Sequence, residues 1–333
     1  MSGHVLRPKK LAVLEFSSTS CKLLIGNVRQ LTEGFRWGEP AFVNRSVMTN
    51  AWFDLHVRKW GAKTVFQRKL QPAIMDLRTV LLKHSPDSIH CVATSGFRKT
   101  QMEKALRRML EAELTQQIHV LSAEEEAKAT VDAYLWSKTR GDRACLFIDQ
   151  GGGTTEIAHL QENGDRSLSH SLPMGTLSAL VRFVHQKQSL EELFSAVDVP
   201  TSLVLPTDLN VVASGSALTN CLGLRSNQRQ HERVLAKSFL EERTEQIQRR
   251  IRLQYTNAEQ VREILLQTDQ RSMFLQNEIK SWSGLQFFIR VLEAANQDRI
   301  RINGAGLRYG IFRQQLNRHY PDFEQHPERY DLW

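Results

Sequence analysis

The chain has 333 residues, of which 41% are hydrophobic and 24% are charged. This length exceeds that of a usual single domain, so we expect two lobes with a sizeable apolar core, and the composition excludes a small disulfide-stapled scaffold. The formal net charge of +8 favours an anionic ligand, such as a polyphosphate, a phosphorylated nucleotide or nucleic acid.

The cysteines and the first residues indicate a reduced, cytoplasmic protein. Cys21, Cys91, Cys145 and Cys221 are far apart in the sequence and form no CxxC pair, as is typical of a reducing compartment. The opening segment MSGHVLRPKKLAVLEF has an apolar run too short for a signal-peptide core or a membrane span. We therefore expect a cytoplasmic chain without membrane contact.

Apolar spacing and turn residues predict strands that alternate with helices. LAVLEF and CKLLIGNV form a hairpin around a polar turn, and FRWGEPAFVNRSV continues in extended form. Helical spacing extends from about 63 to 83, SIHCVATSGFR is a strand that ends at a polar turn, and a helix follows from about 100 to 114. This alternation defines the fold class as α/β.

The segment IHVLSAEEEAKATVDAYLWS is predicted to be a short strand followed by a helix. Ser122 and Glu125 have the spacing of a capping box, which places Glu124, Glu125 and Glu126 in the first helical turn. Carboxylates there can complement the helix dipole. Alternatively, one of them can act as a general base that takes a proton from an attacking water molecule.

Later segments repeat a strand followed by a turn of small residues. These segments are CLFIDQGGGTTEIAHL, LNVVASGSALTNCLGL and RINGAGLRYGIFRQQL. LEFSSTSCKL also aligns with IDQGGGTTEI, pairing Glu15 with Asp149 and Ser20 with Thr154. Two such hairpins predict two similarly built lobes facing a common cleft, although short turns of small residues also match by chance.

The two hairpin turns carry residues that suit phosphate and a metal ion. Glycines and small hydroxyl residues let several backbone N–H groups approach a phosphate, although Gly151–Gly153 equally suit an ordinary hairpin turn. The carboxylate before each turn, Glu15 or Asp149, can hold Mg²⁺ through water, and Asp149 is the better candidate. Arg98 can clamp phosphate oxygens or form a surface ion pair.

Other reaction classes have little support in the sequence. It contains no GxxxxGK[ST] loop, no GxSxG elbow and no histidine cluster with metal-ligand spacing, which argues against a nucleophilic serine or zinc hydrolase. The basic run from Arg225 to Leu253 is either a solvated helix face with paired Glu and Arg residues or a contact for nucleic acid or a protein partner.

From about Leu11 to Leu316 the chain resembles, motif by motif and in order, the Ppx/GppA family of exopolyphosphatases and guanosine pentaphosphate phosphohydrolases. This family belongs to the superfamily of actin-like, sugar kinase and Hsp70-type ATPases. The matching segments are VLEFSSTSCKLLI, VATSGFR, VLSAEEEAKA, IDQGGGTTE, SLPMG, VASGSALT and GAGLRYG. The most specific match is IDQGGGTTE, because the family has Asp-x-Gly-Gly-Gly-Ser-Thr-Glu at this point.

The resemblance implies an α/β fold of two ribonuclease H-like (actin-like ATPase) lobes around a central phosphate-binding cleft. The lobes would span residues 1–122 and 123–308, and a C-terminal helix and tail, 309–333, would return to the first lobe. The chain ends soon after its last motif, as in the short form of the family without the extra helical domain. The implied reaction is Mg²⁺-dependent release of the terminal phosphate from polyphosphate or guanosine pentaphosphate.

The resemblance also implies roles for individual residues. Glu126 takes the place of the catalytic glutamate and Arg98 that of the phosphate clamp. The residues in metal-binding positions are Glu15, Asp149 and Glu156, for Mg²⁺ or another divalent cation. The residues in phosphate-binding positions are Ser17, Ser18, Thr19, Ser20, Thr94, Gly151, Gly152, Gly153, Thr154, Ser214 and Gly215.

The chain departs from the family pattern in its first loop. The family has Asp-x-Gly-Ser-Asn-Ser where this chain has EFSSTS, residues 15–20. The longer carboxylate of Glu15 shifts where an ion would lie, and Ser17 lacks the access to positive φ that glycine has. Two acids are also missing from Asn303–Gly310, and Lys128 stands where arginine is usual. A binding or regulatory protein that senses a phosphorylated nucleotide without efficient catalysis is therefore an alternative to the phosphohydrolase.

The expected ligand is polyphosphate or a guanosine penta- or tetraphosphate. We do not expect a membrane as a partner. Binding of nucleic acid is a weaker hypothesis than the phosphohydrolase or the regulatory protein. The sequence does not choose between polyphosphate and guanosine pentaphosphate. It does not determine the oligomeric state either, for which a homodimer is one option.

Overall fold

The computed structural model describes residues 10–17, 19–27, 42–49, 56, 58–98, 101–137, 144–162, 166–195, 209–222, 233–255, 257–267 and 269–320. The chain divides into two compact units. The first comprises Met1–Lys138 and Ala305–Trp333, and the second comprises Thr139–Gly304. Each unit contains its own mixed β-sheet, which confirms the α/β class.

The sheet of the first unit has five strands in the order β3-β2-β1-β4-β5. These are β1 (Lys10–Phe16), β2 (Ser20–Asn27), β3 (Phe42–Met48), β4 (Ser88–Ala93) and β5 (Ile118–Val120). β1 and β2 form the predicted antiparallel hairpin, whereas β1, β4 and β5 run parallel to one another. The carboxyl ends of these three strands therefore meet at one edge of the sheet, where ligands bind in open α/β sheets.

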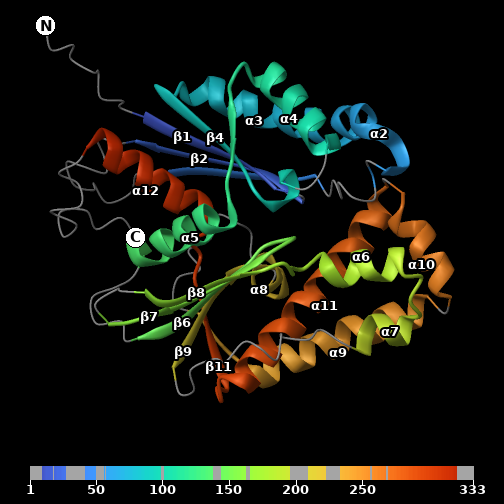
Figure 1. Cartoon of the computed structure of the whole chain (residues 1–333). Helices are drawn as coiled ribbons and strands as arrows, with labels where there is room; N and C mark the ends of the chain where they lie inside the picture. The colour runs from blue at the N-terminus through green and yellow to red at the C-terminus, as the bar shows by residue number, and fades with distance from the viewer. Residues whose placement is uncertain are drawn as a thin grey trace, which may run out of the picture. The chain divides into compact units, whose positions relative to one another are not determined.

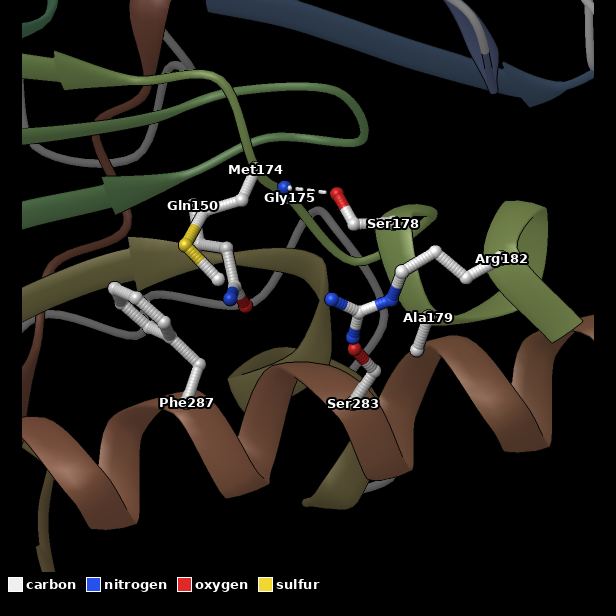
Figure 2. Close-up of a pocket in the computed structure, with 8 residues that line it drawn as sticks. All are labelled: Gln150, Met174, Gly175, Ser178, Ala179, Arg182, Ser283 and Phe287. Atoms are coloured by element: carbon white, nitrogen blue, oxygen red, sulfur yellow. Dashed lines mark hydrogen bonds between the residues drawn. The ribbon is translucent and has the colours of Figure 1, made fainter. Parts of the chain in front are cut away.

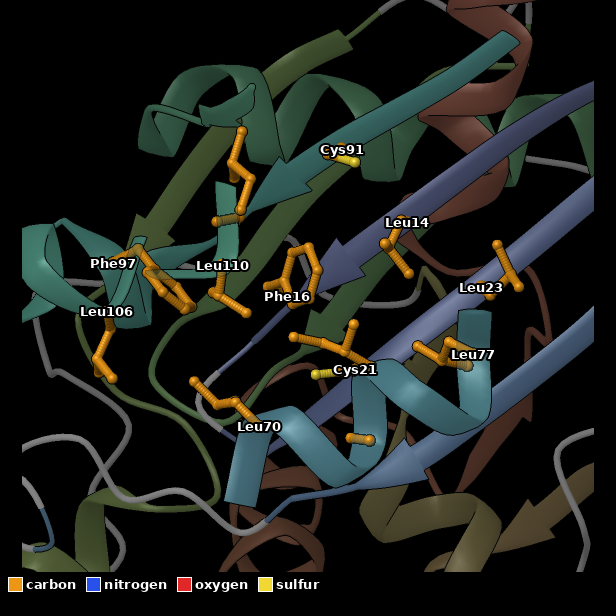
Figure 3. Close-up of a cluster of buried hydrophobic side chains, with 14 of the residues drawn as sticks. Leu14, Phe16, Cys21, Leu23, Leu70, Leu77, Cys91, Phe97, Leu106 and Leu110 are labelled. Carbon is orange, nitrogen blue, oxygen red and sulfur yellow. The ribbon is translucent and has the colours of Figure 1, made fainter. Parts of the chain in front are cut away.

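Helices cover both faces of this sheet (Figure 1). In chain order they are α2 (Arg58–Val65), η2 (Phe66–Leu70), α3 (Gln71–His84), η3 (Ser95–Phe97), α4 (Gln101–Leu114), α5 (Ala123–Ser137) and α12 (Leu307–His319). Because side chains alternate along a strand, Leu14 and Phe16 of β1 pack in one cluster with residues of α3 and α4 (Figure 3). Leu11 and Val13 pack in a second cluster with residues of α5 and α12.

Helices α5 and α12 pack closely against each other. A Cβ atom added to Gly310 would lie 1.6 Å from the carbonyl oxygen of Ala129, so only glycine fits at this crossing. Beside it the rings of Trp136 and Phe312 stack at a centroid distance of 6.2 Å. The boundary expected after residue 122 therefore differs from the observed division, in which α5 belongs to the first unit because its apolar side chains are buried in the same cluster as those of β1 and α12.

The sheet of the second unit has six strands in the order β10-β11-β9-β6-β7-β8. These are β6 (Cys145–Gln150), β7 (Thr155–Leu160), β8 (Arg166–Leu172), β9 (Asn210–Gly215), β10 (Val234–Ala236) and β11 (Arg299–Ile302). β6 and β7 form the second predicted hairpin, while β6, β9 and β11 run parallel. The second unit therefore repeats the arrangement of the first, with a hairpin beside parallel strands.

The helices of the second unit are α6 (Ser178–His185), α7 (Leu190–Ser195), α8 (Ser216–Cys221), α9 (Lys237–Gln254), α10 (Ala258–Leu265) and α11 (Gln270–Ala294). The long helix α11 is buried over much of its length and contacts α6, α8, α9 and α10. It is therefore a common support for these four helices.

Helix α9 contains most of the basic run noted in the sequence; residues 225–232 lie outside the described part of the chain. Its buried side chains include Leu240, Ile247 and Ile251. Its charged side chains form ion pairs, such as Arg250 with Glu278 on α11 at 3.2 Å. The described part of the run therefore has the structure of a helix with one buried face and paired charges elsewhere.

The four cysteines are buried free thiols. Burial raises the pKa of Cys21 and Cys91 to about 12, and that of Cys221 to about 11. These thiols are protonated at neutral pH and pack as small apolar groups. Among the described residues, no helix combines the length and the apolar character that crossing a membrane requires.

Replacing Gly310 by Ala should destabilise the first unit, because the new methyl group would force α5 and α12 apart. We expect a loss of about 1–3 kcal/mol in the free energy of unfolding, measured with urea. Gly306→Ala is the matched control, since a Cβ atom there meets no atom within 4 Å. Equal losses in the two variants would show that the crossing is not tight.

Candidate active site

The candidate residues of the first unit lie at or just beyond the carboxyl ends of β1, β4 and β5. The backbone N–H of Thr94 donates to the carbonyl of Phe16 at 3.0 Å. The N–H of Leu121 donates to the carbonyl of Ala93 at 2.9 Å. These hydrogen bonds extend the parallel pairing beyond the strands and hold the three loops side by side.

The two residues with expected catalytic roles, Arg98 and Glu126, form an ion pair. Nη1 of Arg98 donates to Oε2 of Glu126 at 2.7 Å and also to the carbonyl of Leu121 at 2.7 Å. Glu126 is 7% exposed. A buried carboxylate that receives a charge-assisted hydrogen bond is held in one place, so the loop after β4 fixes the first turn of α5.

The capping box at the start of α5 separates the roles of its glutamates. The N–H of Glu125 donates to Oγ of Ser122 at 3.1 Å, and the N–H of Ser122 donates to Oε2 of Glu125 at 2.8 Å. This confirms the predicted cap. Glu124 is exposed. Glu126 is therefore the one glutamate of this cluster that is buried against the loops.

In the first loop, the hydroxyl of Ser17 lies at the centre of the turn. Its Oγ accepts the N–H of Ser20 at 3.1 Å and that of Thr19 at 3.4 Å. The backbone N–H of Ser17 donates to the carbonyl of Ser20 at 2.9 Å. Ser18 lies outside the described residues. The turn is thus organised by a side chain at the position where the family has glycine.

Glu15 is 3% exposed and lies between two cationic side chains. Nζ of Lys22 donates to its Oε1 at 2.7 Å, and Nη1 of Arg308 lies 3.8 Å from its Oε2. Arg308 also donates from Nη2 to Oδ1 of Asn44 at 2.9 Å. Burial raises the pKa of Glu15, but Lys22 and Arg308 outweigh this effect and hold the pKa below its ordinary value.

Lys22, Asn44 and Arg308 were not among the predicted site residues. Lys22 had a signal in the sequence, because the register of the predicted hairpin places it directly opposite Glu15. Arg308 and Asn44 had none, since their approach depends on α12 returning to the first sheet. Glu15 does not fit a divalent-cation site, because two positive charges already face its carboxylate.

In the second unit, four polar side chains form a row across neighbouring strands. Ser214 on β9 pairs in register with Asp149 on β6, which pairs with Glu156 on β7, which pairs with Ser171 on β8. Directly opposite residues share one face of a sheet. The hydroxyl of Ser214 donates to Oδ1 of Asp149, and that of Ser171 donates to Oε1 of Glu156 at 3.1 Å.

Two carboxylates placed directly opposite each other repel unless a positive charge or hydrogen-bond donors compensate. Within the described ranges, no group of three or more His, Cys, Asp or Glu side chains could hold a metal ion. Mg²⁺ nevertheless fits the oxygen ligands of Asp149 and Glu156, because it binds through one or two carboxylates and completes its shell with water and substrate phosphate.

The second loop, Gly151–Thr154, is held through its carbonyl groups. The N–H of Thr176 donates to the carbonyl of Gly151 at 3.1 Å, and that of Leu177 donates to Gly152 at 2.9 Å. A Cβ atom on Gly175 would lie 2.6 Å from both carbonyl oxygens, which explains the glycine of SLPMG. Within the described part of the chain, the N–H groups of Gly152, Gly153 and Thr154 donate to no acceptor.

The turn after β9 lies beside this loop. Gly215 pairs in register with Gln150, immediately before the glycines. Its φ of 147° is in the region that favours glycine, and a Cβ atom would lie 3.0 Å from the carbonyl oxygen of Gln150. Of the residues expected to bind phosphate, Ser214, Gly215 and the second loop are therefore brought together at the ends of β6 and β9.

Figure 2 shows a small pocket lined by residues that include Gln150, Gly175, Ser178 and Phe287. The N–H of Gly175 donates to Oγ of Ser178 at 2.9 Å (Figure 2). With a cavity volume of about 10 Å³, this space suits one water molecule and is too small for a phosphate ligand. The pocket is therefore not a candidate phosphate site.

The two mixed sheets, each with polar loops at the carboxyl ends of parallel strands, define a protein of the actin-like ATPase fold. The model of the Ppx/GppA phosphatase family matches residues 62–319. The chain belongs to this family.

Several solved structures have a similar fold, and three of them are named as exopolyphosphatases or as PPX-GPPA proteins. An exopolyphosphatase-like protein is 18% identical, with a TM-score of 0.67 over 94% of this chain and 99% of the other. An exopolyphosphatase from Cytophaga hutchinsonii is 16% identical, with a TM-score of 0.65 over 92% and 98%. The Aquifex aeolicus PPX-GPPA enzyme is 16% identical, with a TM-score of 0.62 over 92% and 99%.

A curated relative, the guanosine-5'-triphosphate,3'-diphosphate pyrophosphatase of Photobacterium profundum, is 23% identical over 265 residues. The match covers 78% of this chain and 49% of the relative. The chain thus spans about half the length of the curated relative that it matches.

The ion pairs of Glu15 predict how stability depends on pH. Because its folded pKa is lowered, its contribution is present above the unfolded pKa, near 4.5, and is lost as the pH falls through the folded value. At pH 7, Glu15→Gln should cost about 3 kcal/mol, since it leaves two cations unpaired. Urea unfolding from pH 7 to pH 3 should show this difference shrinking below about pH 4.5. A difference that does not change with pH would contradict the ion pairing.

Proposed function

We propose that the protein is a Mg²⁺-dependent phosphohydrolase that releases orthophosphate from a terminal phosphoanhydride, in inorganic polyphosphate or guanosine pentaphosphate. The observation that carries the proposal is the buried ion pair of Arg98 and Glu126 at the carboxyl ends of the parallel strands. Family membership and the intact second glycine loop support it.

In this proposal Glu126 takes the proton from the attacking water. Its place at the start of α5 is fixed by the capping box and by Arg98, so that its carboxylate needs little reorganisation during the reaction. Arg98 has further donors on its guanidinium besides the one bonded to Glu126, and these suit phosphate oxygens. One side chain can therefore both orient the base and bind the substrate.

The second loop binds phosphate oxygens through the N–H groups of Gly152, Gly153 and Thr154. The N–H groups of Thr176 and Leu177 bind the loop carbonyls, which keeps the N–H groups of the loop in a fixed direction. Asp149 and Glu156 hold Mg²⁺, with Ser214 and Ser171 orienting the carboxylates. When bound, the ion neutralises the negative charge of the phosphate chain.

The test is phosphate release from polyphosphate, guanosine pentaphosphate and ATP, with Mg²⁺ and with EDTA. Glu126→Gln should lower turnover by about 10²–10⁴-fold, because an amide of the same shape keeps a hydrogen bond to Arg98 but cannot accept the proton. Glu124→Gln is the matched control, as it removes an exposed carboxylate from the same helical turn. Turnover that is unchanged in Glu126→Gln would overturn the assignment.

The second candidate is a regulatory protein that binds a phosphorylated nucleotide without efficient catalysis. It is favoured by the first loop, where Ser17 accepts the N–H groups of Thr19 and Ser20 and where Glu15 is paired with Lys22. Tight binding of guanosine pentaphosphate by the correctly folded wild-type protein, with no release of phosphate from any of the three substrates, would favour this candidate.

A further inference from the structure

We propose that Glu15 is not a metal ligand but the counter-ion of Lys22 and Arg308, and that divalent-cation binding depends on the carboxylates of the second unit alone. The resemblance to the family placed Glu15, Asp149 and Glu156 together as metal ligands. The contacts of Glu15 with Lys22 and Arg308 do not fit that role. This inference rests on the proposed function only in taking a divalent cation as the ligand.

The first step is the charge around Glu15. Lys22 and Arg308 carry two positive charges against one carboxylate, so the group has a net charge of +1, calculated as +2 for the cations and −1 for Glu15. A metal carboxylate must instead present net negative charge to a cation. A divalent ion beside Glu15 would meet two like charges within the reach of an ion pair, and it would be repelled.

The second step is burial. Glu15 is 3% exposed, and no hydrogen-bond donor among the described residues reaches its Oε2, which faces Arg308 at 3.8 Å. Arg308 has a 12% exposed side chain and is held by Asn44. A metal ion that retains bound water molecules needs space around the carboxylate. Here the cationic side chains take that space.

The third step is the turn itself. The hydroxyl of Ser17 accepts the N–H groups of Thr19 and Ser20, the same type of donor that a phosphate turn offers to its ligand. Both polar resources of the first loop, its carboxylate and these donors, therefore have partners inside the protein. In the second loop, by contrast, the carbonyls of Gly151 and Gly152 accept backbone N–H groups, and among the described residues the N–H groups of the rest of the loop donate to no acceptor.

The carboxylates of the second unit have a different environment. The hydroxyl of Ser214 donates to Asp149, and that of Ser171 donates to Glu156. The two acids lie directly opposite each other on β6 and β7. Two adjacent carboxylates suit Mg²⁺, which binds through one or two carboxylates and completes its shell with water and substrate phosphate.

The experiment is a titration of the metal-free wild-type protein with Mn²⁺, monitored by electron paramagnetic resonance of the free ion. The same titration of Glu15→Gln and Asp149→Asn makes a matched pair, because each variant replaces one carboxylate by its amide. We expect the Kd for Mn²⁺ to stay within about twofold in Glu15→Gln and to rise at least about tenfold in Asp149→Asn. Weakening of similar size in both variants would overturn the inference.

A double-mutant cycle with Glu15→Gln and Lys22→Met tests the ion pair without any metal. In urea unfolding, each variant changes the equilibrium constant of unfolding by some factor. The factor for the double variant should differ about fivefold or more from the product of the factors for the two single variants. Independent effects would overturn the inference. If the wild-type protein bound no Mn²⁺ at all, the proposed metal site in the second unit would fail, and this cycle would still decide the role of Glu15.

Discussion

Buried and half-buried carboxylates near the carboxyl ends of the parallel strands impose the main physical constraint on both units, because a charge removed from water must have a partner. Each carboxylate meets this requirement through a different element. Arg98 in the loop after β4 binds Glu126, Lys22 on β2 binds Glu15, and hydroxyls on adjacent strands bind Asp149 and Glu156. The polar loops, the strand register and the start of α5 are arranged around these contacts.

The two hairpins show how similar local structures acquire different chemistry. Both place a carboxylate before a turn of small residues, on a strand next to a parallel neighbour. In the first hairpin, a lysine lies opposite the carboxylate and a serine hydroxyl occupies the centre of the turn. In the second, another carboxylate lies opposite, and glycines form the turn. Residues across the strand, as much as the loop sequence, thus determine the charge around the carboxylate of such a turn.

Helix α12 belongs to the first unit, and it brings residues from late in the sequence to Glu15. Gly310 allows α12 to pack tightly on α5, the helix that carries Glu126. Arg308, at the start of α12, reaches Glu15 and Asn44. The GAGLRYG motif therefore has two functions in this fold: its glycine permits a close helix crossing, and its arginine places a second positive charge beside a buried acid.

The sequence by itself determined the α/β class, both hairpins, the helix near 63–83 and the capping box of Ser122 and Glu125, because these depend on side-chain periodicity and on hydrogen bonds between residues a few positions apart. Only the tertiary structure decided which cations face Glu15, that Arg98 binds Glu126, and that α5 belongs with the first unit. These contacts join residues far apart in the sequence, so they depend on strand order and on the packing of α12. Lys22 lies between the two cases, since the hairpin register already placed it opposite Glu15, whereas the burial that makes this pairing important came from the fold.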